Sequence, residues 1–148
     1  MKVRLEIDEQ AKEPEIIVRC REDSGEMIRT AILEVIGQQN KLPFLQDGRE
    51  YYVPVEDLLF LESVDGRTYA HTVGAIYETR MRLYELENIL PGSFVRVSKS
   101  TIANTRQILS ITRNLTGPSL IEFLSSHKRT NASRGYFKQL RNKLNERK

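Results

Sequence analysis

Short apolar runs separated by glycine-containing turns are the feature that most constrains the fold of this chain. Asp47-Gly48 separates the apolar segments 42–45 and 51–53, and Asp-Gly in such a place is typical of a hairpin, because a type I′ turn needs positive φ at both central residues. Further turn signals occur at Asp65-Gly66, Gly74 and Gly117-Pro118. The runs between them predict strands at 58–63, 68–72, 75–79, 94–97, 109–112 and 119–124. Short strands at this spacing favour antiparallel sheets.

Two helices are predicted among these strands. Leu83, Leu86 and Leu90 have helical spacing, and Pro91-Gly92 ends that helix. A last helix follows Arg134, with the apolar residues Phe137, Leu140 and Leu144 on one side. The fold class is therefore mostly β, or α+β overall.

The first 44 residues differ from the rest and predict a small α/β unit. Val3, Leu5 and Ile7 alternate like a strand, and residues 16–18 form a second short apolar run. A helix should follow, with an apolar stripe that begins at Met27-Ile28 and ends before Gly37. We expect two domains, residues 1–44 and 45–148, with the N-terminal unit serving for dimerisation or for contact with a partner protein.

Charge is divided unevenly along the chain. Residues 95–148 contain 12 Lys and Arg and 2 acidic residues, a net charge of +10, whereas residues 1–94 contain 11 Lys and Arg and 18 acidic residues, a net charge of −7. A basic C-terminal third suits the neutralisation of phosphates in nucleic acid. A solvated basic face without a ligand explains the charge equally well.

Several other functions lack support in the sequence. No apolar run has the roughly 20 residues that a membrane span needs, and the N-terminus alternates charged and apolar residues, so we expect a cytoplasmic protein with no membrane insertion. Cys20 is the single cysteine, and the two histidines, His71 and His127, are far apart. With no nucleophile elbow, phosphate-binding glycine loop or zinc-ligand spacing, we expect no enzyme, no metal and no cofactor.

Two motifs near the C-terminus identify a family. Residues 94–104 read Phe-Val-Arg-Val-Ser-Lys-Ser-Thr-Ile-Ala-Asn and are followed by the apolar segment 108–111. This stretch resembles the core of the LytTR family of bacterial transcription regulators, Phe-x-Arg-Val-His-Arg/Lys-Ser-x-x-Val-Asn, before an Ile-x-x-Ile strand. Ser133-Arg134-Gly135-Tyr136 resembles a second family element, Ser-Arg-x-Tyr. The resemblance covers about residues 45–145 and implies the family's elongated arrangement of stacked β-sheets.

The resemblance also implies which residues contact DNA. Ser98 and Lys99 occupy the position that enters the DNA groove in relatives, and Arg134 occupies a base-reading or phosphate-binding position. Lysine and arginine can both donate to the O6 and N7 acceptors of guanine. The family usually has histidine where Ser98 stands, but serine keeps a polar contact. Arg67 is the candidate in the third contact loop, and Asn104 is expected to be a structural turn residue.

Other basic residues are candidates for contacts that position the protein on DNA without reading sequence. These are Lys128, Arg129 and Lys138.

The resemblance implies a sequence-specific transcription regulator. Its partners would be double-stranded DNA and a second copy of the chain, bound at paired half-sites. The roughly 45 N-terminal residues cannot hold the receiver domain of about 120 residues found in many family members, so we expect a regulator that is not controlled through its own receiver. The alternative is a protein-interaction module that keeps the fold and binds another regulator through the acidic N-terminal part.

Overall fold

The computed structural model describes residues 4–13 and 15–146, except for the side chains of residues 33–39. The chain divides into two compact units, Met1–Ile36 and Gly37–Lys148, and each is treated by itself.

The N-terminal unit contains the predicted helix but not the predicted strands. Helix α1 (Glu22–Gln39) extends two residues past Gly37, where the sequence suggested its end. Residues 4–13 and 15–21 form no strand, so the strand predictions there were wrong for the described residues; Val3 lies outside them. The reason is the lack of a neighbour: Leu5 and Ile7 are each 85% exposed, and a strand forms only where another strand takes up its backbone hydrogen bonds.

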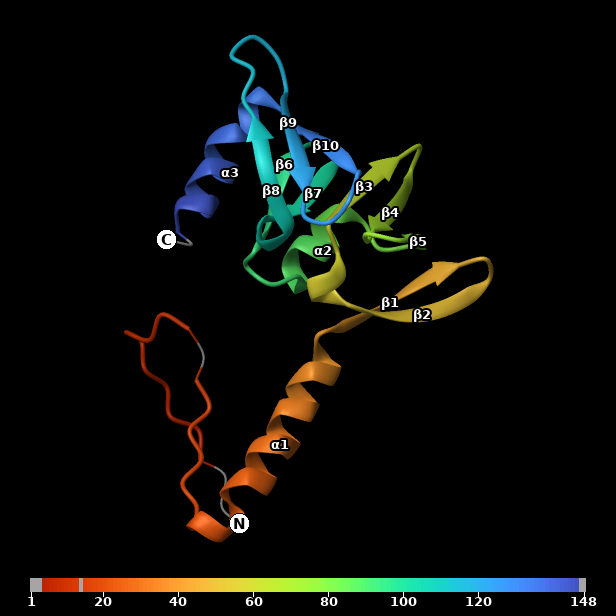
Figure 1. Cartoon of the computed structure of the whole chain (residues 1–148). Coiled ribbons are helices and arrows are strands. Elements are labelled where there is room, and N and C mark those ends of the chain that lie inside the picture. Colours follow the sequence, from red (N-terminus) through yellow and green to blue (C-terminus); the bar gives the residue numbers. More distant parts are fainter. Residues whose placement is uncertain (1–3, 14, 147–148) are drawn as a thin grey trace. The chain divides into compact units, whose positions relative to one another are not determined.

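A seven-stranded sheet forms the larger part of the second unit (Figure 1). Its order is β2-β1-β5-β4-β3-β7-β6, with every neighbouring pair antiparallel. The strands are β1 (Lys41–Gln46), β2 (Arg49–Pro54), β3 (Phe60–Val64), β4 (Arg67–His71), β5 (Ile76–Thr79), β6 (Phe94–Ser98) and β7 (Thr101–Asn104). Helix α2 (Leu83–Ile89) separates β5 from β6, as predicted.

Both Asp-Gly pairs form hairpin turns, where the sequence predicted a hairpin at Asp47-Gly48 and a turn at Asp65-Gly66. Asp47 and Gly48 have φ of 51° and 76° between β1 and β2, and Asp65 and Gly66 have φ of 51° and 79° between β3 and β4. Positive φ at both central residues is the signature of a type I′ turn, which matches the right-handed twist of the flanking strands.

A second, three-stranded antiparallel sheet follows, in the order β10-β9-β8. It contains β8 (Ile108–Thr112), β9 (Ser119–Phe123) and β10 (Arg129–Ala132), and α3 (Arg134–Asn145) comes directly after it. Single turns of 3₁₀ helix, Val55–Asp57 and Thr105–Gln107, precede β3 and β8. Strands β7 and β10 were not predicted: each has four residues, and neither shows the alternation of apolar and polar residues that is typical of a half-buried strand.

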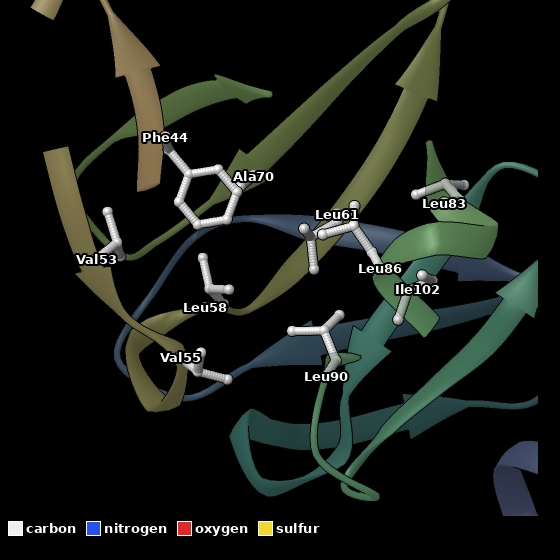
Figure 2. Close-up of a cluster of buried hydrophobic side chains, with 10 residues drawn as sticks. All are labelled: Phe44, Val53, Val55, Leu58, Leu61, Ala70, Leu83, Leu86, Leu90 and Ile102. Atoms are coloured by element: carbon white, nitrogen blue, oxygen red, sulfur yellow. The ribbon is translucent and has the colours of Figure 1, made fainter. Parts of the chain in front are cut away.

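Two apolar clusters hold the second unit together. The first lies between the large sheet and α2 and is drawn in Figure 2; Leu58, Leu61 and Leu86 are completely buried in it. The second joins the two sheets and α3, where Phe60 of β3 stacks on Phe123 of β9 with ring centroids 5.2 Å apart. Leu140, also completely buried, anchors α3 in this second cluster.

Candidate nucleic-acid interface

Two backbone hydrogen bonds join the three segments that the sequence marked for DNA contact. The N–H of Ser133 donates to the carbonyl oxygen of Val97 at 2.9 Å, and the N–H of Ser63 donates to the carbonyl oxygen of Ser100 at 2.8 Å. Residues 98–100, here called the β6–β7 turn, therefore lie between the end of β3 and the start of α3. The two family-like motifs, about 30 residues apart in sequence, are adjacent in space.

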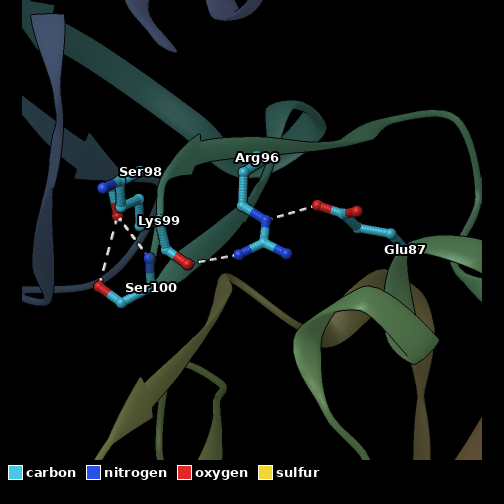
Figure 3. Close-up of polar contacts among 5 residues, drawn as sticks. All are labelled: Glu87, Arg96, Ser98, Lys99 and Ser100. Atoms are coloured by element: carbon cyan, nitrogen blue, oxygen red, sulfur yellow. Dashed lines mark hydrogen bonds and ion pairs between the residues drawn. The ribbon is translucent and has the colours of Figure 1, made fainter. Parts of the chain in front are cut away.

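The β6–β7 turn is fixed by contacts to its own backbone (Figure 3). The Arg96 guanidinium donates to the Lys99 carbonyl oxygen and pairs with the Glu87 carboxylate of α2. The Ser98 hydroxyl accepts from the N–H of Ser100 at 3.2 Å. Because these bonds use the Lys99 carbonyl and not its ammonium, the exposed Lys99 side chain is held on a defined backbone and can donate outward.

The start of α3 presents Arg134 beside this turn. Arg134 is the first residue of the helix and is exposed, while Ser133 makes no side-chain capping bond and contributes its backbone N–H to Val97. Helix α3 packs against β6, and the Arg113 guanidinium lies 4.9 Å from the centroid of the Phe137 ring. Lys138, one turn further along α3, is exposed.

Arg67 reaches the same region from the β3–β4 hairpin. It follows the Asp65-Gly66 turn, is exposed, and its Nε lies 3.9 Å from Oε1 of Glu78. An exposed ion pair at this distance contributes little to stability. Arg67 and Lys99 line one groove. The groove is also lined by Arg80 and Arg82. Neither residue was predicted as a contact from the sequence; the available signal was two arginines directly before a helix in the acidic part of the chain.

Lys128 and Arg129 make contacts away from the β6–β7 turn. The Lys128 ammonium donates to the Ala75 carbonyl oxygen at 2.8 Å, and burial lowers the pKa of Lys128. The Nε of Arg129 lies 3.6 Å from Oε1 of Glu122 on the neighbouring strand. Arg129 begins β10, whereas Arg134 follows the end of that strand. The side-chain contacts of Lys128 and Arg129 are thus made with residues outside the segments joined at the β6–β7 turn.

His71 lies in the core, paired with Glu62. Its Nε2 is 2.9 Å from Oε1 of Glu62, and its ring stacks on Phe60 with centroids 4.2 Å apart. Burial lowers the pKa of His71, and the hydrogen bond to Glu62 partly opposes that effect. Nδ1 is buried without a hydrogen-bond partner among the residues described here. This arrangement links β3 to β4 and is consistent with a structural role.

The described part of the chain has neither a metal site nor a membrane-spanning helix. Within residues 4–13 and 15–146, no group of three His, Cys, Asp or Glu side chains is placed to hold a metal ion. No helix in these ranges combines the length and apolar character required to span a membrane.

Comparisons with known proteins identify the family to which this chain belongs. Residues 48–145 match the family model described as the LytTr DNA-binding domain. The chain is 30% identical over 98 residues to proteins of Staphylococcus aureus strains NCTC 8325 and COL, named uncharacterized HTH-type transcriptional regulators, and 29% identical to one of strain RF122. Each match spans 66% of this chain and 66% of the relative's length.

A solved LytTr DNA-binding domain from Bacillus cereus has the same fold. Its TM-score is 0.66 at 24% sequence identity, and the match covers 71% of this chain and 96% of that domain. The predicted fold class, mostly antiparallel β with short helices, is confirmed. The family resemblance drawn from the two sequence motifs is confirmed as well, and the chain belongs to the LytTR family of DNA-binding domains.

Proposed function

We propose that this chain is a transcription regulator that binds DNA sequence-specifically through the segments joined at the β6–β7 turn. The observation that carries the proposal is the pair of backbone hydrogen bonds, from Ser133 to Val97 and from Ser63 to Ser100, within a LytTR domain. These bonds bring basic side chains from three separate segments to one region of the surface. The names of the Staphylococcus aureus relatives, which are transcriptional regulators, support the same function.

In this proposal, loops and the N-terminal end of α3 recognise the DNA sequence, and no helix-turn-helix motif is inserted into the groove. Helices α2 and α3 are separated by strands β6–β10, so they are not the consecutive helix pair of that motif. In our proposal the β6–β7 turn enters the major groove, where Lys99 donates to guanine acceptors and Ser98 supplies a polar contact. Arg134 can make a bidentate contact to guanine, and Arg67 is the contact from the hairpin.

The remaining basic candidates would have different roles. Lys138 and Arg129 are exposed and suited to phosphate contacts that position the protein. The Lys128 ammonium already bonds the Ala75 carbonyl, so its first role in our proposal is to stabilise the β9–β10 connection.

We also propose that the functional form is a homodimer paired through the N-terminal unit, with each subunit on one of two similar half-sites. The support is the exposure of large apolar side chains there, such as Ile16 (66%), Ile17 (68%) and Met27 (72%). Exposed apolar clusters mark interaction surfaces. Half-sites one helical turn apart would place both subunits on one side of the duplex, with the DNA bent between or at them.

DNA binding is tested by fluorescence anisotropy with duplex DNA from upstream of the gene for this chain, against random duplex of equal length. We expect Lys99→Ala and Arg134→Ala each to weaken specific binding by about 1–3 kcal/mol. The matched control is Arg49→Ala, an exposed arginine on β2, which should leave the preference intact. Absence of binding to any DNA at low salt would contradict the proposal and favour the protein-interaction alternative.

Dimerisation is tested by sedimentation equilibrium. Ile17→Asp and Met27→Asp should shift the wild-type dimer to monomer, whereas Leu109→Asp, at a 61% exposed position of β8, should not. A wild-type chain that sediments as a monomer at high micromolar concentration would rule out this pairing.

A further inference from the structure

A groove of about 460 Å³ beside the β6–β7 turn is strongly basic. The β3–β4 hairpin, the end of β5 and the start of α2 line it together with the turn. Five of its lining side chains are cations, and a single carboxylate, Glu78, opposes them. The cations are Arg67, Arg80, Arg82, Arg96 and Lys99.

Only some of the five groove cations form ion pairs or hydrogen bonds within the protein. The Arg96 guanidinium is engaged by Glu87 and the Lys99 carbonyl, and Arg67 faces Glu78 at 3.9 Å. Arg80 and Arg82 are exposed and form no ion pair with any other residue of the described ranges. Like charges gathered in a groove repel one another and attract an anion. The two arginines therefore add positive charge to the groove that no ion pair among the described residues offsets.

Arg82 also occupies a position that folding alone would give to another residue type. It is the N-cap of α2 and makes no side-chain capping hydrogen bond. N-cap positions favour Ser, Thr, Asp or Asn, whose oxygens accept from the first helical N–H groups; a guanidinium has no acceptor, and its charge is unfavourable at that end of a helix. Capping of α2 therefore does not explain the arginine at position 82.

We infer that Arg80 and Arg82 bind phosphates of the DNA backbone next to the bases reached from the β6–β7 turn. The inference rests on the proposed function, because Lys99 belongs both to that turn and to the groove wall. A duplex engaged by Lys99 brings its sugar-phosphate backbone over the groove. Contacts to phosphates fix the register of the protein on the duplex and carry no sequence information themselves.

The test is the salt dependence of binding to a labelled duplex of mixed sequence, which reports phosphate contacts without knowledge of the target site. The full chain and the double variant Arg80→Ala/Arg82→Ser are titrated between 50 and 200 mM salt. The slope of log K against log salt should become shallower by about 1 to 2, because each phosphate contact contributes about 0.9. The single variant Arg80→Ala should account for about one half of that change.

The control removes the same charge elsewhere. Lys41→Ala/Arg49→Ala takes two exposed cations from β1 and β2 that do not line the groove, and its slope should stay near the wild-type value. The thermal midpoint of the groove variant should be unchanged or raised, since serine at position 82 can cap α2.

The outcomes separate this inference from the proposed function. A wild-type chain that binds DNA while groove and control variants show equal slopes would overturn the inference alone. Saturable binding of inorganic phosphate to the wild-type groove with an unchanged DNA slope would also overturn it, in favour of a small phosphorylated ligand. A wild-type chain that binds no DNA at low salt would overturn both.

Discussion

The side-chain amide of Asn104 donates from Nδ2 to the backbone carbonyl oxygen of Leu58 at 2.9 Å, joining the end of β7 to the residues that lead into β3. Its Oδ1 accepts from the N–H of Arg106 at 3.2 Å, and the side chain is almost completely buried. The turn role predicted for Asn104 is present, together with a second, long-range bond that the sequence did not reveal.

Replacing Asn104 should therefore be costly. Asn104→Ala leaves the Leu58 carbonyl without its amide donor in a buried position, and such a loss lowers the free energy of unfolding by about 1–3 kcal/mol. The midpoint of urea denaturation, compared between the wild-type chain and Asn104→Ala, measures this loss of stability. Gln107→Ala is the control, because Gln107 makes a similar amide bond to the Glu56 carbonyl at 2.8 Å in an exposed setting; a loss there equal to that of Asn104→Ala would contradict the argument from burial.

The β3–β4 turn makes a prediction that depends on backbone conformation alone. Gly66 has φ of +79° with no atom within 4 Å of an added Cβ. Gly66→Ala meets no clash, yet it should lower the free energy of unfolding by about 1 kcal/mol, because an L-residue is strained at that φ. Gly74→Ala, also in open space but without positive φ, should be neutral or slightly stabilising. Thermal denaturation compares the two, and equal midpoints would exclude strain as the cause.

His71 should make stability depend on pH. Burial lowers the pKa of His71 below its usual 6.5, with Glu62 opposing and Lys128 reinforcing the shift. As pH falls below about 6.5 the unfolded chain takes up the proton first, so the free energy of unfolding falls until the lowered pKa of the folded state is reached. Urea denaturation between pH 8 and 5 should show this decline, and His71→Gln should reduce it. An unchanged decline in His71→Gln would assign it to other groups.

Arg96 should act on DNA binding through the shape of the β6–β7 turn. Its guanidinium bridges the Glu87 carboxylate and the Lys99 carbonyl, and lysine cannot reproduce this two-sided planar contact. Arg96→Lys keeps the charge but should weaken specific DNA binding by up to about 1.5–3 kcal/mol, the range for one lost hydrogen bond to a charged group. Glu87→Gln, measured beside it by anisotropy, tests the other half of the bridge. Wild-type affinity in Arg96→Lys would show that charge alone is sufficient.

Local chemistry determined which parts of the fold could be predicted. The hairpins at Asp47-Gly48 and Asp65-Gly66 follow from turn residues that need positive φ. Strands without such a local signal could not be found in the same way: β10 (Arg129–Ala132), which pairs with β9, has one buried residue, Ala132. The alternation of Leu5 and Ile7 is typical of a strand, but alternation alone does not supply a second strand to accept and donate the backbone hydrogen bonds. The strand prediction there was therefore wrong.

The candidate site was predictable in its parts but not in its assembly. Motif matches singled out Lys99 and Arg134, and their roles remain predictions. Their proximity depends on the Ser133 to Val97 hydrogen bond, which no local pattern encodes. Arg80 and Arg82 were missed because they belong to the acidic part of the chain and reach the groove only through the order of strands in the sheet.

The bonds that join the three segments come from the main chain, and every residue except proline carries the same N–H and C=O groups. The identity of the side chains at positions 67, 98, 99 and 134 is thus largely independent of the framework that presents them. Under the proposed function, side chains at these positions, Ser98 among them, could therefore be exchanged, and the DNA sequence that they contact could change, while the main-chain framework underneath stays the same.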